Sequence, residues 1–291
     1  MTSPTTSSDQ PVQPRRAGQS GQPGQAAPAA EPAALGPVPG PSTAGAASTR
    51  RRIFAQSAFE AKMILRNGEQ LMVTILLPVM ALVGLSQTSI IDLDTAGRSR
   101  IDFITPGIIA LAVMSAAFTS QAIATAFDRR NGVLRLMATT PLGRGGLLAS
   151  KIIGVLAVEA VQIVVISAVA VGLGWRPDPV GIPLALVAVL LGTAAFTSLA
   201  MLLAGTLRAE GVLAVANIVL VLLTVLGAVL TPAEQLPDAL RHVALLLPSG
   251  ALGEAMRGAF FDASIPPFSL LVLLAWAAGL GWGAGKLFKW H

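Results

Sequence analysis

The chain has 291 residues, and its composition excludes a water-soluble globule: 12% of residues are charged, about half the share usual in soluble domains, and the mean hydropathy is +0.70. The absence of cysteine excludes disulfides and thiolate metal sites, and the two histidines, His242 and His291, are too far apart in sequence to suggest a shared metal site. A pI near 10.7 and a net charge of +5 indicate either nucleic-acid binding or the basic cytoplasmic side of a membrane protein.

Residues 1–49 are rich in Pro, Gly, Ala and Ser and have almost no large apolar side chains. Such a segment cannot bury enough apolar surface to offset the entropy of ordering, so we expect a disordered cytoplasmic tail. It has no continuous apolar run after its first charges, so we expect no signal peptide. The membrane domain is then predicted to cover residues 50–291.

An amphipathic helix is predicted at residues 53–69, directly after Arg50, Arg51 and Arg52. Its apolar residues recur at helical spacing with cations among them, which is typical of a helix lying in the membrane interface. A soluble amphipathic helix is the alternative. 

Six apolar stretches after this helix are each close to the roughly 20 residues needed to cross a bilayer. The predicted spans are residues 70–87, 106–127, 152–172, 182–203, 212–230 and 268–287. We expect a kink at Pro78 in the first span, and Thr105 as N-cap with Pro106 at the first helical position of the second. Short re-entrant helices are expected between the fifth and sixth spans, with an amphipathic cap lying flat on the outer surface as the alternative. The fold class is therefore an all-α membrane protein.

The distribution of Lys and Arg orients these spans. With the N-terminus inside, fifteen cations fall on the inner side and five on the outer side. This bias predicts that both termini are cytoplasmic, and it explains the high pI without nucleic acid.

The segment between spans two and three, "DRRNGVLRLMATTPLGRGGLLASK", carries five cations and one acid, Asp128. Val133, Leu134, Met137 and Ala138 share one side of a short helix, and Pro141 makes Thr140 its expected end. This pattern favours an amphipathic helix at the cytoplasmic surface on which a cytosolic partner docks. An anchored linker that merely follows the positive-inside rule is the alternative.

Residues 101–151 resemble the second span and coupling helix of ABC-2 type permeases of the drug-resistance exporter branch, and the resemblance extends more loosely over residues 50–291. The family's "D-[FY]-x-x-P-G" start of span two is matched by Asp102, Phe103, Pro106 and Gly107. Its coupling element is matched by Asp128, Arg129, Gly132, Leu134, Thr140, Pro141, Leu142 and Arg144. Arg130 and Arg135 stand where acids are common, and Val133 stands where Thr is common.

The resemblance implies a permease of an exporter in the cytoplasmic membrane, moving a drug, lipid, glycan precursor or other hydrophobic compound. The permease would pair with itself or a paralogue and bind two ATP-hydrolysing subunits. The residues implied in coupling are Asp128, Arg129, Arg130, Gly132, Leu134, Arg135, Leu136, Thr140, Pro141 and Arg144. No G-x-x-x-x-G-K-[ST] motif occurs, so we expect no cofactor or metal in this chain, with ATP and Mg bound by the partner, and no catalysis by the chain itself.

Glu159 is the only acid well inside a predicted span, with Gln162 one turn away. A carboxylate at this depth is costly and tends to face protein or a water-filled cavity. One hypothesis places both residues on the translocation path, and the alternative makes them hydrogen-bonded packing groups. Glu159 also permits a different function, a proton-coupled secondary transporter, and a scaffold or membrane enzyme is the third class.

Overall fold

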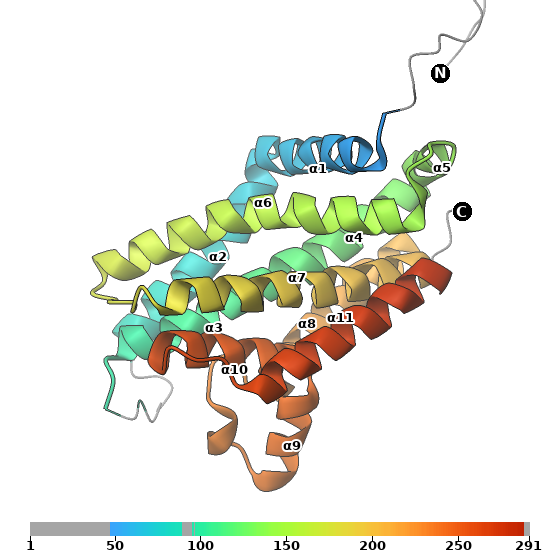
Figure 1. Ribbon diagram of the computed structural model, residues 1–291. Helices are drawn as coiled ribbons and strands as arrows, with labels where there is room; N and C mark the ends of the chain where they lie inside the picture. The colour runs from blue at the N-terminus through green and yellow to red at the C-terminus, as the bar shows by residue number, and fades with distance from the viewer. Residues whose placement is uncertain (1–46, 89–94, 96, 288–291) are drawn as a thin grey trace, which may run out of the picture. The chain divides into compact units, whose positions relative to one another are not determined.

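The computed structural model describes residues 47–88, 95 and 97–287, which form helices joined by short connections, with no strand among these residues. The predicted tail, residues 1–49, lies almost wholly outside the described residues. The helices, labelled in Figure 1, are α1 (Thr49–Arg66), α2 (Gly68–Gln87), α3 (Arg100–Met114), α4 (Gln121–Arg130), α5 (Val133–Ala138), α6 (Gly143–Gly172), α7 (Gly181–Thr206), α8 (Ala209–Leu226), α9 (Asp238–Leu246), α10 (Pro248–Phe261) and α11 (Pro267–Leu287). A π-helical stretch, η1 (Ser115–Ser120), joins α3 to α4, and a 3₁₀ turn, η2 (Ala233–Gln235), precedes α9.

Five helical segments in the described part of the chain are long and apolar enough to cross a membrane: residues 100–130, 143–172, 181–206, 209–226 and 267–287. These agree with the second to sixth predicted spans. The predicted first span lies in α2, whose apolar part, Thr74–Gln87, is shorter. Pro78 lies inside α2, which continues unbroken to Gln87.

The α3–η1–α4 segment is the centre of the bundle. In its most apolar stretch 83% of the residues are buried, against 17% in α8 and 22% in α11. The other helices pack around it and α7: α10 and α11 contact α7, and α1 lies along α6 (Figure 1). The apolar outer faces of α8 and α11 therefore remain uncovered, as expected for helices whose solvent is hydrocarbon.

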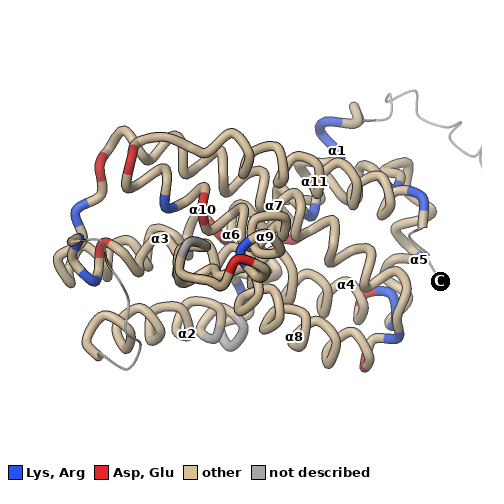
Figure 2. Tube along the Cα trace, turned by 90° about the horizontal axis from the view of Figure 1, so that it is seen from below, with Lys and Arg blue, Asp and Glu red and all other residues tan. Residues whose placement is uncertain are grey.

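Charged residues gather at the two ends of this bundle (Figure 2). One end carries α5 and the other carries the α6–α7 connection, so the charge pattern follows the axis along which the spans run. Few charged residues lie inside the bundle, and because a buried charge is costly, each of them is expected to have a hydrogen-bond or ionic partner.

Span two begins six residues earlier than predicted, at Arg100 instead of Pro106. Ser99 is the N-cap of α3, and its Oγ accepts a hydrogen bond from the Asp102 N–H at 3.2 Å. The prediction that Thr105 caps the span was wrong, because its hydroxyl instead donates to the Ile101 carbonyl at 2.7 Å, within the helix. Pro106 is an internal residue, which membrane helices tolerate where local groups satisfy the freed carbonyl.

The fifth span also ends earlier than predicted. α8 stops at Leu226, with Gly227 as its C-cap, and Ala228 adopts a left-handed φ of 48°. The short helices between the fifth and sixth spans are α9 and α10, and Pro248 is the first residue of α10. α10 is buried along most of its length, whereas α9 is largely exposed.

Candidate functional site

The predicted coupling segment forms a tight reversal between α4 and α6, at whose tip lies α5. Gly132, with φ of 78°, ends the link from α4, and Gly143, with φ of 69°, begins α6. These left-handed conformations favour glycine, so both turns depend on the residue type. The helix in the predicted coupling segment, α5, spans only Val133–Ala138, because Arg129 and Arg130 belong to α4.

The three branched apolar residues of α5 point in different directions. Leu134 is fully buried in a small cluster with Leu147, Met201 and Ala284. Leu136 is 71% exposed and Val133 is 37% exposed. One side chain thus anchors α5 to the bundle, and two remain available on its outer surface.

Most cations of the segment make their bonds within the chain. The Arg129 guanidinium donates to the Leu207 carbonyl at the end of α7, and Arg130 pairs with Glu210 at 2.6 Å. Arg144 donates to the carbonyls of Gly285 and Lys286 near the end of α11, at 3.2 and 3.1 Å. Arg135 is exposed. The charge excess therefore serves largely to tie the ends of neighbouring helices together.

A buried lysine forms the centre of an ionic network beneath α5. Lys151 on α6 has no exposed side-chain surface, and its Nζ lies 3.0 Å from Oε2 of Glu60 on α1 and 3.5 Å from Oδ2 of Asp128 on α4. The carboxylate side chains are 13% and 25% exposed. We call Lys151, Glu60 and Asp128 the buried ion network; it joins α1, α4 and α6.

Two side chains of α1 extend this network to the coupling segment. Gln56 donates to Glu60 Oε1 at 3.2 Å and lies 4.0 Å from the Met137 sulfur on α5. Arg52 donates to the Pro141 carbonyl. α1 therefore contacts both the network and the segment that follows α5.

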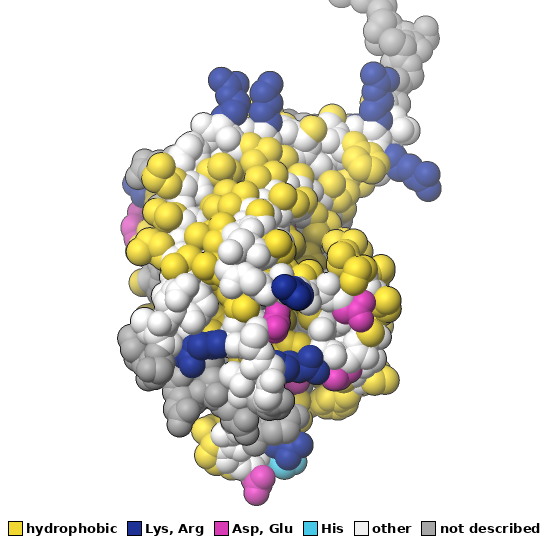
Figure 3. Space-filling model, turned by 90° about the vertical axis from the view of Figure 1, so that its left-hand side faces the viewer, with side chains coloured by type: hydrophobic (Ala, Val, Ile, Leu, Met, Phe, Trp, Pro, Cys, Tyr) yellow, Lys and Arg dark blue, Asp and Glu magenta, His cyan; other side chains and the backbone are white. Residues whose placement is uncertain are grey.

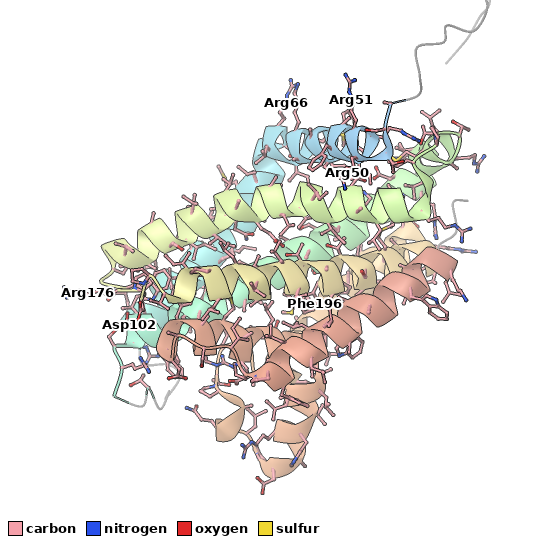
Figure 4. The ribbon with its side chains drawn as sticks, in the orientation of Figure 1. Arg50, Arg51, Arg66, Asp102, Arg176 and Phe196 are labelled. Atoms are coloured by element: carbon pink, nitrogen blue, oxygen red, sulfur yellow. The ribbon has the colours of Figure 1, made fainter. Side chains whose placement is uncertain are left out.

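The opposite edge of α1 is free of these contacts. Arg51 and Arg66 project away from the bundle in Figure 4, and Phe54 and Phe59 are exposed. Sequence reasoning placed α1 in the membrane interface but did not predict its link to α6. The available signal was Glu60, which is the only acid in α1.

A polar groove runs beside span two. It has a volume of about 950 Å³ and is bordered by α2, by the α3–η1–α4 segment and by α8. Its lining includes the hydroxyl of Thr74 in α2 and four hydroxyl or amide side chains in helices long enough to cross a membrane: Ser115, Thr119, Ser120 and Asn217. Polar side chains facing hydrocarbon would be costly, so this face is suited to water, a solute or another subunit.

The π-helical stretch supplies three of these groups. Ser115, Thr119 and Ser120 are all in η1, whose wider turn places them on the same side. π-helical turns are rare in proteins overall, but those that occur are often at functional sites. The Thr119 hydroxyl is itself buried and has no hydrogen-bond partner among the described residues.

The Asp102–Gly107 motif packs the far end of the bundle. Asp102 Oδ1 accepts from the Arg176 N–H at 3.1 Å, and Figure 4 shows both residues at the end that carries the α6–α7 connection. The Phe103 ring lies 6.0 Å from that of Phe261. A Cβ at Gly107 would approach the Val229 carbonyl to 2.7 Å, so glycine permits close contact between α3 and the segment after α8.

A family comparison places this architecture. The model of the ABC-2 family transporter proteins matches residues 63–286, which include the groove, the coupling segment and every spanning helix. The chain belongs to the ABC-2 family. A search of curated proteins finds no match. An ABC-2 protein is a transmembrane component of a transporter, so the apolar helices are those of a multi-pass membrane protein.

The ABC-2 match begins after Glu60, whereas Lys151 and Asp128 lie inside it. One carboxylate of the buried ion network thus comes from the helix that precedes most of the family region. 

Glu159 and Gln162 lie in the packed interior of this ABC-2 protein and are fully buried. Glu159 Oε2 accepts from the Thr193 hydroxyl at 2.6 Å, and Gln162 donates to the Thr74 carbonyl at 2.8 Å. Neither side chain lines the polar groove, although Gln162 holds the backbone of a residue that does. Their role in transport stays a prediction.

Proposed function

We propose that this chain is the membrane subunit of an exporter driven by ATP that a separate subunit hydrolyses. The observation that carries the proposal is α5, which presents Leu136 and Val133 outward while Leu134 is buried. Leu136 therefore protrudes from a helix that the buried Leu134 holds against the bundle. Such a contact suits a pocket on a protein partner, where a few buried side chains supply most of the binding free energy.

The buried ion network supports a mechanical role for α5. It ties α4 and α6, the helices on either side of α5, to one another and to α1. We propose that closure of two ATPase subunits displaces α5 and that the network carries this displacement to spans two and three together. ATP and Mg are held by the ATPase, since this chain has no phosphate-binding motif of its own.

We propose that the polar groove forms one half of the transport path and that a second permease subunit forms the other. Its hydroxyl and amide groups border apolar residues such as Leu77 and Leu220, a combination suited to a hydrophobic or amphipathic compound. We propose that a second permease subunit, identical or paralogous, closes the groove in the cytoplasmic membrane. The positive-inside bias supports cytoplasmic termini and a cytoplasmic α5.

The test is reconstitution of the permease with its ATPase. Leu136→Glu should weaken binding of the ATPase by about 2 kcal/mol, roughly 30-fold in affinity, because it puts a charge into an apolar contact. Pull-down and permease-stimulated ATP hydrolysis are the measurements. The matched control is Leu246→Glu, because Leu246 is a similarly exposed leucine on α9 at 58%. Full stimulation by Leu136→Glu would overturn the assignment of α5 as the docking element.

The alternative, proton-coupled transport through Glu159, makes different predictions. It requires transport that uncouplers abolish and vanadate leaves intact, and loss of transport in Glu159→Gln. The position of Glu159 away from the groove is the reason we propose ATP-driven export instead.

A further inference from the structure

A second cavity lies at the end of the bundle opposite α5. We call it the lateral pocket; its volume is about 480 Å³, and it opens between α6 and α7. Ala168 and Val171 form one wall, Ile182 and Leu186 the other, and Ile109 and Met256 the floor. Ser167 is the only lining residue with a hydroxyl, amide or charged side chain. The volume falls within the range of protein cavities that hold small ligands.

The mouth of the pocket faces the side of the bundle that is suited to hydrocarbon. Val171 is 55% exposed, Ile182 48% and Leu186 54%, and all three belong to or adjoin membrane-spanning helices. Small residues leave the gap, since Ala168 and Ala185 both line it. The start of α7 packs closely on α10, because Gly181 lies directly against the Ala259 carbonyl.

An apolar pocket of this kind takes an apolar occupant. Water finds almost no partners there, and empty space forfeits the dispersion contacts of the lining atoms. The most abundant apolar chains beside such a mouth are the acyl chains of the bilayer. The shape of the pocket, open at the side and closed below by α3 and α10, suits a chain that enters from the membrane.

The rim of the pocket carries a cation suited to a headgroup. Arg176 is exposed and stands between two lining residues, Trp175 and Pro177. Its guanidinium has no ion pair among the described residues. The carboxylate of neighbouring Asp178 accepts from the Val180 N–H, and the Arg176 N–H is held by Asp102. Figure 3 shows charged side chains on this end of the molecule beside a broad hydrophobic area.

We propose that the lateral pocket binds one acyl chain of an anionic membrane phospholipid, with the lipid phosphate at Arg176. The bound chain contacts Met256 and Phe260, and so fills the space between α10 and the spanning helices α6 and α7. This lipid is a fixed component of the permease and differs from the compound that the polar groove carries. The inference rests on the lateral pocket alone and holds whether or not ATP drives the transporter.

Trp175 provides the measurement. It is 4% exposed, lines the pocket, and packs edge-on against Phe260 with ring centroids 5.2 Å apart. In a full-length protein with Trp276, Trp282 and Trp290 changed to Phe, Trp175 is the sole tryptophan. Reconstituted in nanodiscs, it should lose most of its fluorescence when the lipid is phosphatidylglycerol with brominated acyl chains. Brominated phosphatidylcholine should quench it less, because that headgroup has no net charge.

Pocket-filling variants separate binding in the pocket from general contact with lipid. Ala168→Phe fills the mouth from an exposed position and should abolish the quenching, and Ser167→Leu should do the same from the neighbouring residue. Leu190→Phe is the control, because Leu190 is 51% exposed on α7 and does not line the pocket. Arg176→Gln should make the two lipids quench equally while quenching persists.

Four results would overturn the proposal. If brominated lipids leave Trp175 fluorescence unchanged, no acyl chain occupies the pocket. The same conclusion follows if Ala168→Phe is quenched as strongly as the unmodified protein. If the two lipids quench equally in the protein that retains Arg176, the lipid phosphate does not bind at Arg176. Relief of quenching by an exported compound would assign the pocket to that compound instead of a lipid.

Discussion

Lys151 offers a quantitative test of how the α5 end of the bundle is held together. Lys151→Met keeps the length of a fully buried side chain but removes its charge, leaving the carboxylates of Glu60 and Asp128 without their cation. Breaking a buried ion pair from one side costs about 3–5 kcal/mol. At about 2–4 °C per kcal/mol for a chain of this size, the expected loss in Tm is about 6–20 °C in detergent.

The companion variant separates charge from packing. Glu60→Leu and Asp128→Leu combined with Lys151→Met replace the whole network by apolar groups, which is often neutral or stabilising, so most of the lost Tm should return. The surface control is Lys286→Met, whose Nζ lies 4.2 Å from the Trp282 ring centroid at an exposed site; it should cost less than about 1 kcal/mol. A Lys151→Met protein that melts within about 1 °C of the unmodified protein would refute the reasoning.

Two further predictions concern packing, each with a matched control measured by the same thermal unfolding. Gly107→Ala should destabilise by about 1–3 kcal/mol, because its Cβ meets the Val229 carbonyl oxygen, whereas Gly84→Ala has open space and should lose nothing; equal behaviour of the two would contradict the close contact. Leu134→Ala should cost about 2–5 kcal/mol by leaving a cavity, while Leu136→Ala on the same helix should stay within about 0.5 kcal/mol; similar losses would show that α5 is not anchored on one side.

The spanning helices were predictable because each depends on local composition. Long apolar runs identified spans two to six, and Gly132 and Pro141 bounded the turn that contains α5. The start of α3 was missed because two residues competed for the cap. Ser99 with Asp102 in the first turn formed the cap, and a proline at position 106 proved compatible with the interior of a membrane helix.

The buried ion network could not be predicted in the same way. Glu60 and Lys151 are 91 residues apart, and their contact depends on how α1 lies against α6. Arg130 likewise has its partner in Glu210, which follows two further spans. The positive-inside rule predicts the sign of these charges. Their partners depend on tertiary packing, which the spacing of residues along the sequence does not reveal.

Most cations of the coupling segment bond to groups of the same chain, and this has a consequence for protein engineering. Of the larger side chains of α5, Val133, Arg135 and Leu136 are exposed and remain for a partner subunit to contact. Because Leu134 and the helix ends carry the attachment to the bundle, these three positions can be exchanged without disturbing it. A permease of this type should bind the ATPase subunit of another transporter once the residues of this single helical turn are replaced by those of that transporter's permease.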